Sequence, residues 1–143
     1  MQVDYIVLHH SASADNTTIE EIRQWHLNKG FSDIGYHKVI YQNGEVKQGR
    51  NDSLKGAHAF GANAFTLGIC SIGNFDINKM KNTQYKSLLQ VCATLLKRYG
   101  LNKDRLIGHR DVAKMFNVPE GASACPGKFF PIEQLKKDLD KYL

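Results

Sequence analysis

The stretch "YIVLHHSAS", residues 5–13, joins a short apolar run to two adjacent histidines, His9 and His10. Apolar side chains at successive positions predict a strand over residues 3–9 that is buried on both faces. Successive side chains of a strand point to opposite faces, so His9 and His10 cannot both serve one site from a regular strand. The rest of the sequence must therefore show which histidine carries chemistry.

The composition is that of an ordinary globular chain with a mild excess of positive charge. The 143 residues carry a formal net charge of +5 and have 42% hydrophobic side chains, which predicts a single domain over residues 1–143. A basic surface favours polyanionic partners, although scattered lysines also serve solubility alone. The sequence contains no basic stripe interleaved with aromatic residues, so we expect no nucleic-acid binding.

The sequence also lacks the marks of a membrane protein or a disulfide-stapled protein. No apolar run approaches the roughly 20 residues of a membrane span, so we expect no membrane insertion. The three cysteines are an odd number at wide spacings, which is no disulfide framework. The first residues lack a basic segment followed by an apolar one, so no signal peptide is visible and we expect synthesis in the cytoplasm.

The hydrophobic periodicity places helices and strands along the whole chain. A capping-box pattern at Thr17–Glu20 predicts a helix that stops at Gly30. Asn43-Gly44 predicts a hairpin turn between residues 38–41 and 45–48. The further predicted elements are a strand at 66–72, a long helix over 85–99, a strand at 105–107 and a helix over 131–143. This order predicts an α/β domain with one central sheet covered by helices on both faces.

Three side chains stand out as candidates for chemistry. His9 and His109 each follow a predicted strand, and Cys125 lies in the loop "SACPG" outside any periodic pattern. Sites in open α/β sheets lie at strand ends, so these side chains can converge. Two histidines and one cysteine supply three of the four tetrahedral positions of Zn²⁺ and leave one open, as in catalytic sites. The alternative for each histidine is an ordinary capped or core imidazole.

Other segments hold weaker candidates. Tyr36 follows a turn in "GYH", and His58 and Asn63 lie in the glycine-rich stretch "GAHAFGANAFTLGI". Tyr36 can equally be a packing aromatic, and the glycines can simply serve turns. Cys70 and Cys92 lie in apolar patterns, which predicts buried core residues.

Taken together, these segments resemble the zinc-dependent N-acetylmuramoyl-L-alanine amidases, a family that includes phage amidases and peptidoglycan recognition proteins. The resemblance covers residues 3 to 130 and is carried, in order, by "VLHHSAS", "GYHKVIYQNGEVKQGR", "GAHAFGANAFTLGICSIGNF", "IGHRDV" and "ACPG". The combination is specific, whereas each piece alone is weak.

The resemblance implies a mixed β-sheet flanked by helices and one Zn²⁺ per chain in a groove. It implies hydrolysis of the amide between the lactyl group of muramic acid and L-alanine of the peptidoglycan stem peptide. The zinc ligands implied are His9, His109 and Cys125. Tyr36 is implied near the scissile carbonyl, and Ser123 occupies the position where members carry Lys or Thr. The Ser123 hydroxyl can replace that of Thr but supplies no positive charge.

Further residues are assigned on the same basis. We expect His37, Arg50, His58 and Asn63 to line the groove for the peptide or sugar. The general base is not assigned, and the proton can pass through Tyr36, His37 or solvent.

Residues beside the implied ligands receive supporting roles. Arg110 and Asp111 are expected to hold the loop of His109. His10 is expected to turn away into packing or a backbone hydrogen bond.

Three other functions stay open. Some members of the resembled family bind without hydrolysis and typically lack the cysteine ligand. A cysteine hydrolase would use Cys125 as nucleophile with a histidine base. A nucleic-acid binder is the third, but it needs the basic stripe with aromatic residues that the sequence lacks. His9, Tyr36, His109 and Cys125 are all retained, which favours a lytic enzyme of the endolysin or autolysin type. We also expect a monomer that acts on the cell wall.

Overall fold

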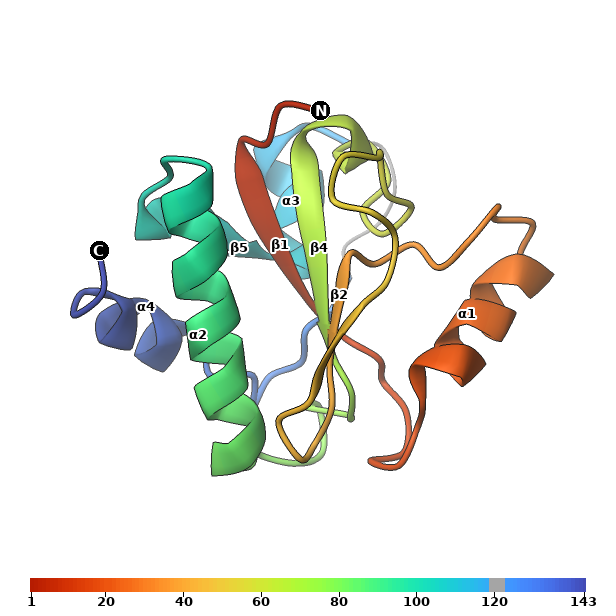
Figure 1. The fold of residues 1–143 in the computed structure, drawn as a ribbon, viewed down its shortest axis with the longest axis horizontal. Coiled ribbons are helices and arrows are strands. Elements are labelled where there is room, and N and C mark those ends of the chain that lie inside the picture. Colours follow the sequence, from red (N-terminus) through yellow and green to blue (C-terminus); the bar gives the residue numbers. More distant parts are fainter. Residues whose placement is uncertain (119–122) are drawn as a thin grey trace.

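A computed structural model describes residues 1–118 and 123–143, whereas residues 119–122 of the predicted domain lie outside the described part. The described strands form one five-stranded sheet in the order β3-β2-β4-β1-β5 (Figure 1). Their bounds are β1 (Tyr5–His10), β2 (Lys38–Ile40), β3 (Val46–Gln48), β4 (Thr66–Ser71) and β5 (Leu106–Gly108). β2, β4, β1 and β5 run parallel and β3 is antiparallel to β2, so the predicted mixed sheet is confirmed.

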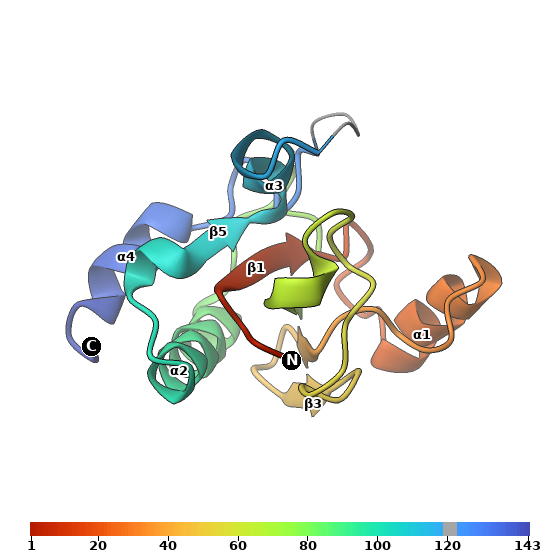
Figure 2. The ribbon, with the colours of Figure 1, turned by 90° about the horizontal axis from the view of Figure 1, so that it is seen from above.

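Helices cover both faces of this sheet. They are α1 (Ile19–Asn28), α2 (Asn82–Arg98), α3 (His109–Met115) and α4 (Ile132–Leu139). α2 and α3 lie on opposite faces, and α4 lies beside α2 (Figures 1 and 2). Among the described residues, no helix combines the length and the apolar character needed to cross a bilayer.

Side chains alternate along β1, so successive residues lie on opposite faces of the sheet. Ile6 and Leu8 are fully buried in the core on the α2 side. Val7 is equally buried but packs with Ile107 and Val112 on the α3 side. Burial on both faces explains the unbroken apolar run of this strand, because parallel sheets are covered twice. It also sends the side chain of residue 9 to the α3 side.

The predicted capping box at Thr17–Glu20 is wrong by one residue. Thr18 caps α1, because its hydroxyl accepts the Glu21 N–H and the Glu21 carboxylate accepts the Thr18 N–H. The Thr17 hydroxyl instead donates to the Ala14 carbonyl in the preceding turn, at 2.7 Å. Both threonines fit the sequence pattern, and this tertiary turn selects the second.

The remaining differences concern short elements and helix ends. The predicted strand at 105–107 is shifted to Leu106–Gly108, and the last helix ends at Leu139, short of residue 143. The sequence pattern missed α3, because its seven residues are too few to show a helical period. That omission matters for the site, because α3 begins at His109.

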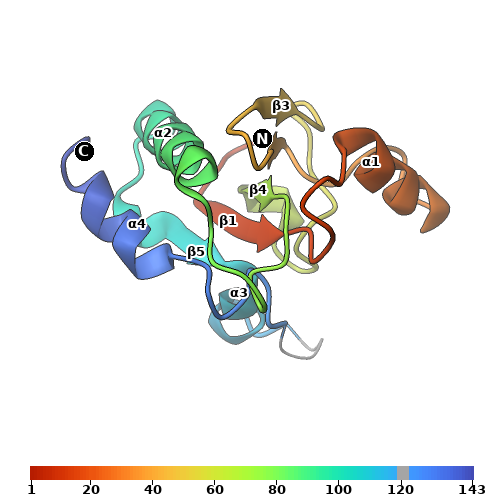
Figure 3. The same cartoon turned by 90° about the horizontal axis from the view of Figure 1, so that it is seen from below.

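The parallel strands end on the same side of the sheet. Figure 3 shows the carboxyl end of β1 between α1 and α3, with the end of β4 beside it. This edge is where α/β sheets hold ligands, and the candidate residues converge there.

Candidate metal centre

The side chains of His9, His109 and Cys125 meet at the carboxyl edge of the sheet. One potential ligand atom from each of them lies within 4.8 Å of the others. The His9 Nδ1 atom is 3.7 Å from Cys125 Sγ, and the His9 and His109 ring centroids are 4.7 Å apart. The three residues come from β1, from the first position of α3 and from the loop before α4. The structure therefore assembles the donor set that the sequence predicts.

Local hydrogen bonds hold His109 and Cys125 in position relative to each other. Asp111 caps the start of α3, because its Oδ2 accepts the N–H of Gly108 at 2.9 Å. The Arg110 N–H donates to the Cys125 carbonyl at 2.7 Å, and its guanidinium donates to the Gly127 carbonyl at 3.1 Å. Asp111 thus fixes the helix that carries His109, while Arg110 ties the cysteine loop to that helix.

The environment of Cys125 favours a protonated thiol in the absence of a cation. Burial raises the pKa of Cys125 to about 12, opposed in part by the backbone N–H of His10, which donates to Sγ at 3.4 Å. A divalent cation beside the sulfur would favour the thiolate. In the same loop, the Ser123 hydroxyl oxygen accepts the N–H of Cys125 at 3.1 Å, which leaves the hydroxyl proton free to donate.

His10 turns away from the donor cluster, as expected. Its Nδ1 atom accepts the backbone N–H of Phe75 at 3.1 Å, and its ring stacks on the Phe75 ring with centroids 6.2 Å apart. Phe75 belongs to the core on the α2 side. Side chains alternate between the two faces of β1. His9, a potential metal ligand, therefore lies on one face, and His10, which packs against Phe75, lies on the other.

The donor cluster lies at the floor of an open cavity of about 650 Å³. Of the residues singled out in the sequence, Tyr36, His58, Asn63 and Ser123 line this groove. The other lining residues outside the donor cluster are His10, Ala12, His26, Lys29, Phe31, Ala57, Ala59 and Phe60.

The end of α1 and the residues that follow it form a wall of the groove that sequence reasoning missed. His26, Lys29 and Phe31 belong to it. His26 is seven residues after Ile19 and four after Ile22, and all three are buried. This helical spacing in the sequence could have predicted that His26 faces inward with the two isoleucines.

His26 ties α1 to the segment that carries Tyr36. Its Nδ1 atom accepts the backbone N–H of Gly35 at 2.8 Å. Burial, with a smaller effect from Lys29, lowers the pKa of His26 to about 4. The ring is therefore neutral near pH 7, which the hydrogen bond from Gly35 requires.

Tyr36 lies directly against the donor cluster. Its ring centroid is 5.0 Å from that of His9 and 5.2 Å from that of His26. Burial, reinforced by Cys70 and Cys125, holds the pKa of the Tyr36 phenol well above its usual value. Tyr36 therefore keeps its proton and can donate a hydrogen bond into the groove.

His58 lies on the other side of His9. Its Nδ1 atom is 2.9 Å from His9 Nε2, and burial followed by the neighbouring His37 lowers the pKa of His58 to about 3. The Asn63 side-chain oxygen accepts the backbone N–H groups of His58 and Ala59 at 2.9 and 2.8 Å. Asn63 thus shapes the glycine-rich loop beside the groove as well as lining it.

The structure does not bring His37 and Arg50 into the groove, contrary to the sequence-based expectation. His37 is fully buried, its Nδ1 accepts the Gly68 N–H at 3.0 Å, and its Nε2 lies 2.8 Å from the Leu54 carbonyl. Both ring nitrogens are occupied by backbone groups. The Arg50 guanidinium donates to the carbonyl groups of Asp33, Ile34 and Lys55. Both residues therefore hold loops together.

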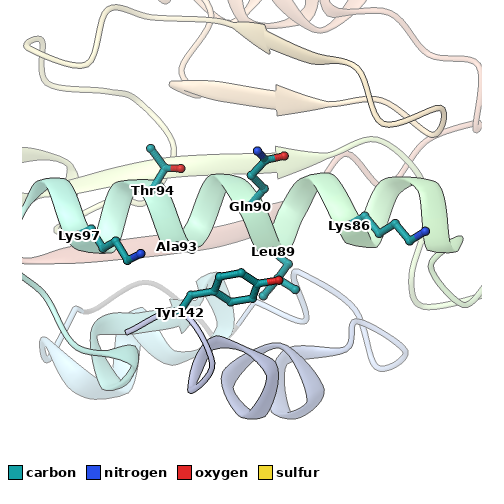
Figure 4. Close-up of a pocket in the computed structure, with 7 residues that line it drawn as sticks. All are labelled: Lys86, Leu89, Gln90, Ala93, Thr94, Lys97 and Tyr142. Atoms are coloured by element: carbon teal, nitrogen blue, oxygen red, sulfur yellow. The ribbon is translucent and has the colours of Figure 1, made fainter.

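A second hollow lies along α2 beside Tyr142, away from the donor cluster (Figure 4). Its lining consists of Lys86, Leu89, Gln90, Ala93, Thr94, Lys97 and Tyr142. None of these side chains is a histidine, a cysteine or a carboxylate.

Cys70 and Cys92 are fully buried in the core, as predicted.

Fold and site together define the class of protein: an α/β domain whose open groove ends in a potential metal centre with two nitrogen donors and one sulfur donor. The N-acetylmuramoyl-L-alanine amidase family matches residues 1–128, and the chain belongs to this family.

Individual proteins support this assignment. The endolysin of Escherichia phage T7 is 38% identical over 104 residues, covering 67% of this chain and 68% of its own. The endolysin N-acetylmuramoyl-L-alanine amidase LysCS from Clostridium intestinale has a TM-score of 0.87 at 34% identity, covering 97% of this chain and 84% of its own. A variant of Drosophila PGRP-LB in complex with tracheal cytotoxin has a TM-score of 0.76 at 25% identity, covering 92% and 79%.

Proposed function

We propose that this chain is a zinc-dependent peptidoglycan amidase of the endolysin type. It would hydrolyse the amide between muramic acid and L-alanine of the stem peptide. The observation that carries the proposal is the convergence of His9, His109 and Cys125 within 4.8 Å at the floor of an open groove. The family match and the endolysin relatives support the choice of substrate.

The donor set fits one Zn²⁺ by its chemistry. Two imidazole nitrogens and one sulfur are ligands that zinc prefers, and three protein ligands leave the open position typical of catalytic sites. His9 is almost fully buried, whereas His109 and Cys125 are partly exposed on the groove side. When bound, Zn²⁺ supplies Lewis acidity that lowers the pKa of water to about 7 and polarises an amide carbonyl.

Two side chains of the groove can stabilise the charge that develops on the carbonyl oxygen. The Tyr36 phenol keeps its proton because burial raises its pKa, so it can donate to an oxyanion. The Ser123 hydroxyl has a free proton, because its oxygen already accepts from the Cys125 N–H. Donors placed where charge develops contribute strongly to acyl-transfer catalysis.

The leaving amine of L-alanine must receive a proton. His37 is removed from the candidates for this transfer, because both of its ring nitrogens bond to backbone groups below the groove. No Asp or Glu is among the described residues that line the groove. We therefore assign the proton transfer to Tyr36 or to solvent.

The cellular setting belongs to the same proposal. We propose that the lytic enzyme is made in the cytoplasm and acts on the cell wall after release from the cell. We propose that it acts as a monomer.

Fragment analysis tests the reaction. Purified peptidoglycan is digested by the zinc-loaded protein, with and without a chelator, and the fragments are analysed by mass spectrometry. We expect new amino termini on L-alanine, their loss with the chelator and their return when Zn²⁺ is restored. New amino termini only within the stem peptide would contradict the bond assignment. Their absence despite tight substrate binding would favour a binding module.

A cysteine hydrolase is the second candidate, because His9 Nδ1 lies 3.7 Å from Cys125 Sγ. Chelation separates the two functions, since a thiol enzyme survives metal removal. Cys125→Ala should abolish both zinc binding and activity, whereas Cys92→Ala, on the buried face of α2, should preserve both. Activity that persists in metal-free protein would support the thiol mechanism.

A further inference from the structure

A chain of hydrogen bonds runs from the donor cluster into β4. His9 Nε2 lies 2.9 Å from His58 Nδ1, and His58 Nε2 lies 3.3 Å from the Thr66 hydroxyl oxygen. The Thr66 hydroxyl donates to the Ala62 carbonyl at 2.8 Å. Each of the three side chains is at least nine-tenths buried, so the chain is shielded from exchange with bulk water.

The chemistry of the last acceptor orients every bond in this chain. The Ala62 carbonyl can only accept, so the single proton of the Thr66 hydroxyl points toward it. The Thr66 oxygen must then accept the proton of His58 Nε2. A neutral imidazole carries one N–H, which leaves His58 Nδ1 as an acceptor. His9 Nε2 therefore donates to His58.

This orientation decides which nitrogen of His9 is free. With its proton on Nε2, a neutral His9 has its lone pair on Nδ1, the atom that faces Cys125 Sγ at 3.7 Å. The opposite orientation would put a proton on Nδ1, between the ring and the sulfur, where it would block metal binding. We propose that Thr66 and His58 are positioning residues that fix the tautomer of His9 and so keep Nδ1 open for the metal.

The surroundings of His58 hold its ring in this role. A Cβ atom at Gly68 would lie 2.5 Å from His58 Cγ, and one at Gly56 would lie 2.8 Å from His58 Cδ2. Both glycines therefore let the backbone approach the ring more closely than any other residue allows. Asn63 fixes the backbone N–H of His58 from the opposite end. The ring has little freedom to turn and reverse the chain.

The inference rests on the proposed zinc site for its purpose, but the tautomer itself can be measured without metal. Nitrogen-15 spectra of metal-free wild-type protein distinguish protonated from unprotonated ring nitrogens. We expect the proton on Nε2 in both His9 and His58. A proton on Nδ1 of either ring would overturn the proposal.

A hydroxyl deletion tests the consequence for metal affinity. Thr66→Val keeps the side-chain shape but removes the acceptor for His58, whereas Thr66→Ser retains a hydroxyl. Zinc affinity is measured by competition with a chromophoric chelator. We expect Thr66→Val to weaken zinc binding by about tenfold or more, as typical for groups that orient metal ligands, with Thr66→Ser close to wild type.

A purely structural role of Thr66 predicts another outcome. Thr66→Val would then lower the melting temperature while its zinc affinity stayed within twofold of wild type, which would overturn the proposal. If Thr66→Val does not fold, His58→Phe replaces it, with His58→Asn as the variant that keeps an acceptor near Nδ1. Loss of zinc affinity in both His58 variants alike would also overturn the proposal.

A failure of the proposed function can be distinguished from a failure of the tautomer proposal, because zinc binding and the ring tautomers are measured independently. Wild-type protein that binds no zinc would contradict the zinc amidase. The nitrogen-15 spectra of the same protein would still decide the tautomers of His9 and His58.

Discussion

His9 and His10 are neighbours in β1, but their rings lie in different environments and substitutions should have different effects. His9→Ala removes a nitrogen from the donor cluster, so we expect loss of zinc and of activity. His10→Ala leaves the buried Phe75 N–H without its acceptor, which costs about 1–3 kcal/mol of the free energy of unfolding. Zinc content by elemental analysis and urea unfolding measure the two effects.

A conservative variant sharpens this comparison. His10→Asn offers an oxygen near the position of Nδ1 and should recover much of the stability that His10→Ala loses. Full zinc occupancy in His9→Ala, or loss of zinc in a folded His10→Asn protein, would contradict the assignment of His9 as the ligand.

Gly68 is a second residue whose replacement should act through a neighbour. Its added Cβ in Gly68→Ala would come within 2.5–2.6 Å of the base of the His58 ring, so the ring must move. We expect a cost of about 1–3 kcal/mol from overpacking, together with weaker zinc binding. Chemical unfolding and zinc titration test this expectation.

Gly30→Ala is the matched control, because Gly30 has a φ of +94° and no heavy atom within 4 Å of an added Cβ. It should cost about 1 kcal/mol through the backbone alone and leave zinc affinity unchanged. Equal zinc affinity in the Gly68 and Gly30 variants would show that the His58 ring position does not affect the metal site.

Residue identities in the sequence predicted the donor set but not the roles of all the polar residues around it. His9, His109 and Cys125 follow strands or lie in a loop outside periodic patterns, and the topology brings them together. His37 and Arg50 belong to recognisable segments, yet their side chains bond to backbone carbonyl and N–H groups. Gly68 is 31 residues from His37 and Asp33 is 17 residues from Arg50, so local pattern cannot reveal these partners.

At the scale of elements, α1 forms a wall of the groove that carries a titratable group, His26. His26 accepts the Gly35 N–H only while Nδ1 is unprotonated. Its pKa is about 4 in the folded protein and near 6.5 when exposed. Between pH 6.5 and pH 4, His26 is protonated in the unfolded chain but stays unprotonated in the folded chain. The free energy of unfolding therefore decreases as pH falls through this range.

His26→Asn isolates this contribution, because its amide oxygen can accept the Gly35 N–H but does not titrate. We expect the variant to lose less stability than wild type between pH 7 and pH 5, by roughly 1 kcal/mol. Urea unfolding at the two pH values measures the difference. Parallel pH profiles of the two proteins would mean that the charge state of His26 does not limit stability.

Helices and strands were predicted correctly where a hydrophobic pattern extends over many residues. The stripe of α2 and the apolar runs of β1 and β4 are visible in the sequence, and the structure confirms all three. The seven-residue α3 was missed, and the start of α1 was displaced by one residue. Short helices and caps depend on tertiary contacts, such as the Asp111 bond to Gly108, which periodicity does not show.

For the whole molecule, the donor cluster joins parts of the chain that are far apart in sequence. His9, His109 and Cys125 come from β1, from α3 and from the loop before α4. A metal that binds all three in the folded state, but has no preformed site in the unfolded chain, must stabilise the fold. This linkage predicts an effect of zinc on unfolding that is independent of substrate.

We therefore expect the melting temperature to rise with free zinc, because the stabilisation grows as RT ln(1 + [Zn²⁺]/Kd) and reaches about 4 kcal/mol at a thousandfold excess over Kd. Calorimetry with metal buffered at defined concentrations measures the dependence. His9→Ala should show almost no zinc dependence, whereas Cys92→Ala should keep the wild-type slope. A protein that uses Cys125 only as a nucleophile and binds no metal would unfold at one temperature at every zinc concentration. Zinc-independent melting of the wild-type protein would therefore contradict the metal centre itself, whatever its activity on cell walls.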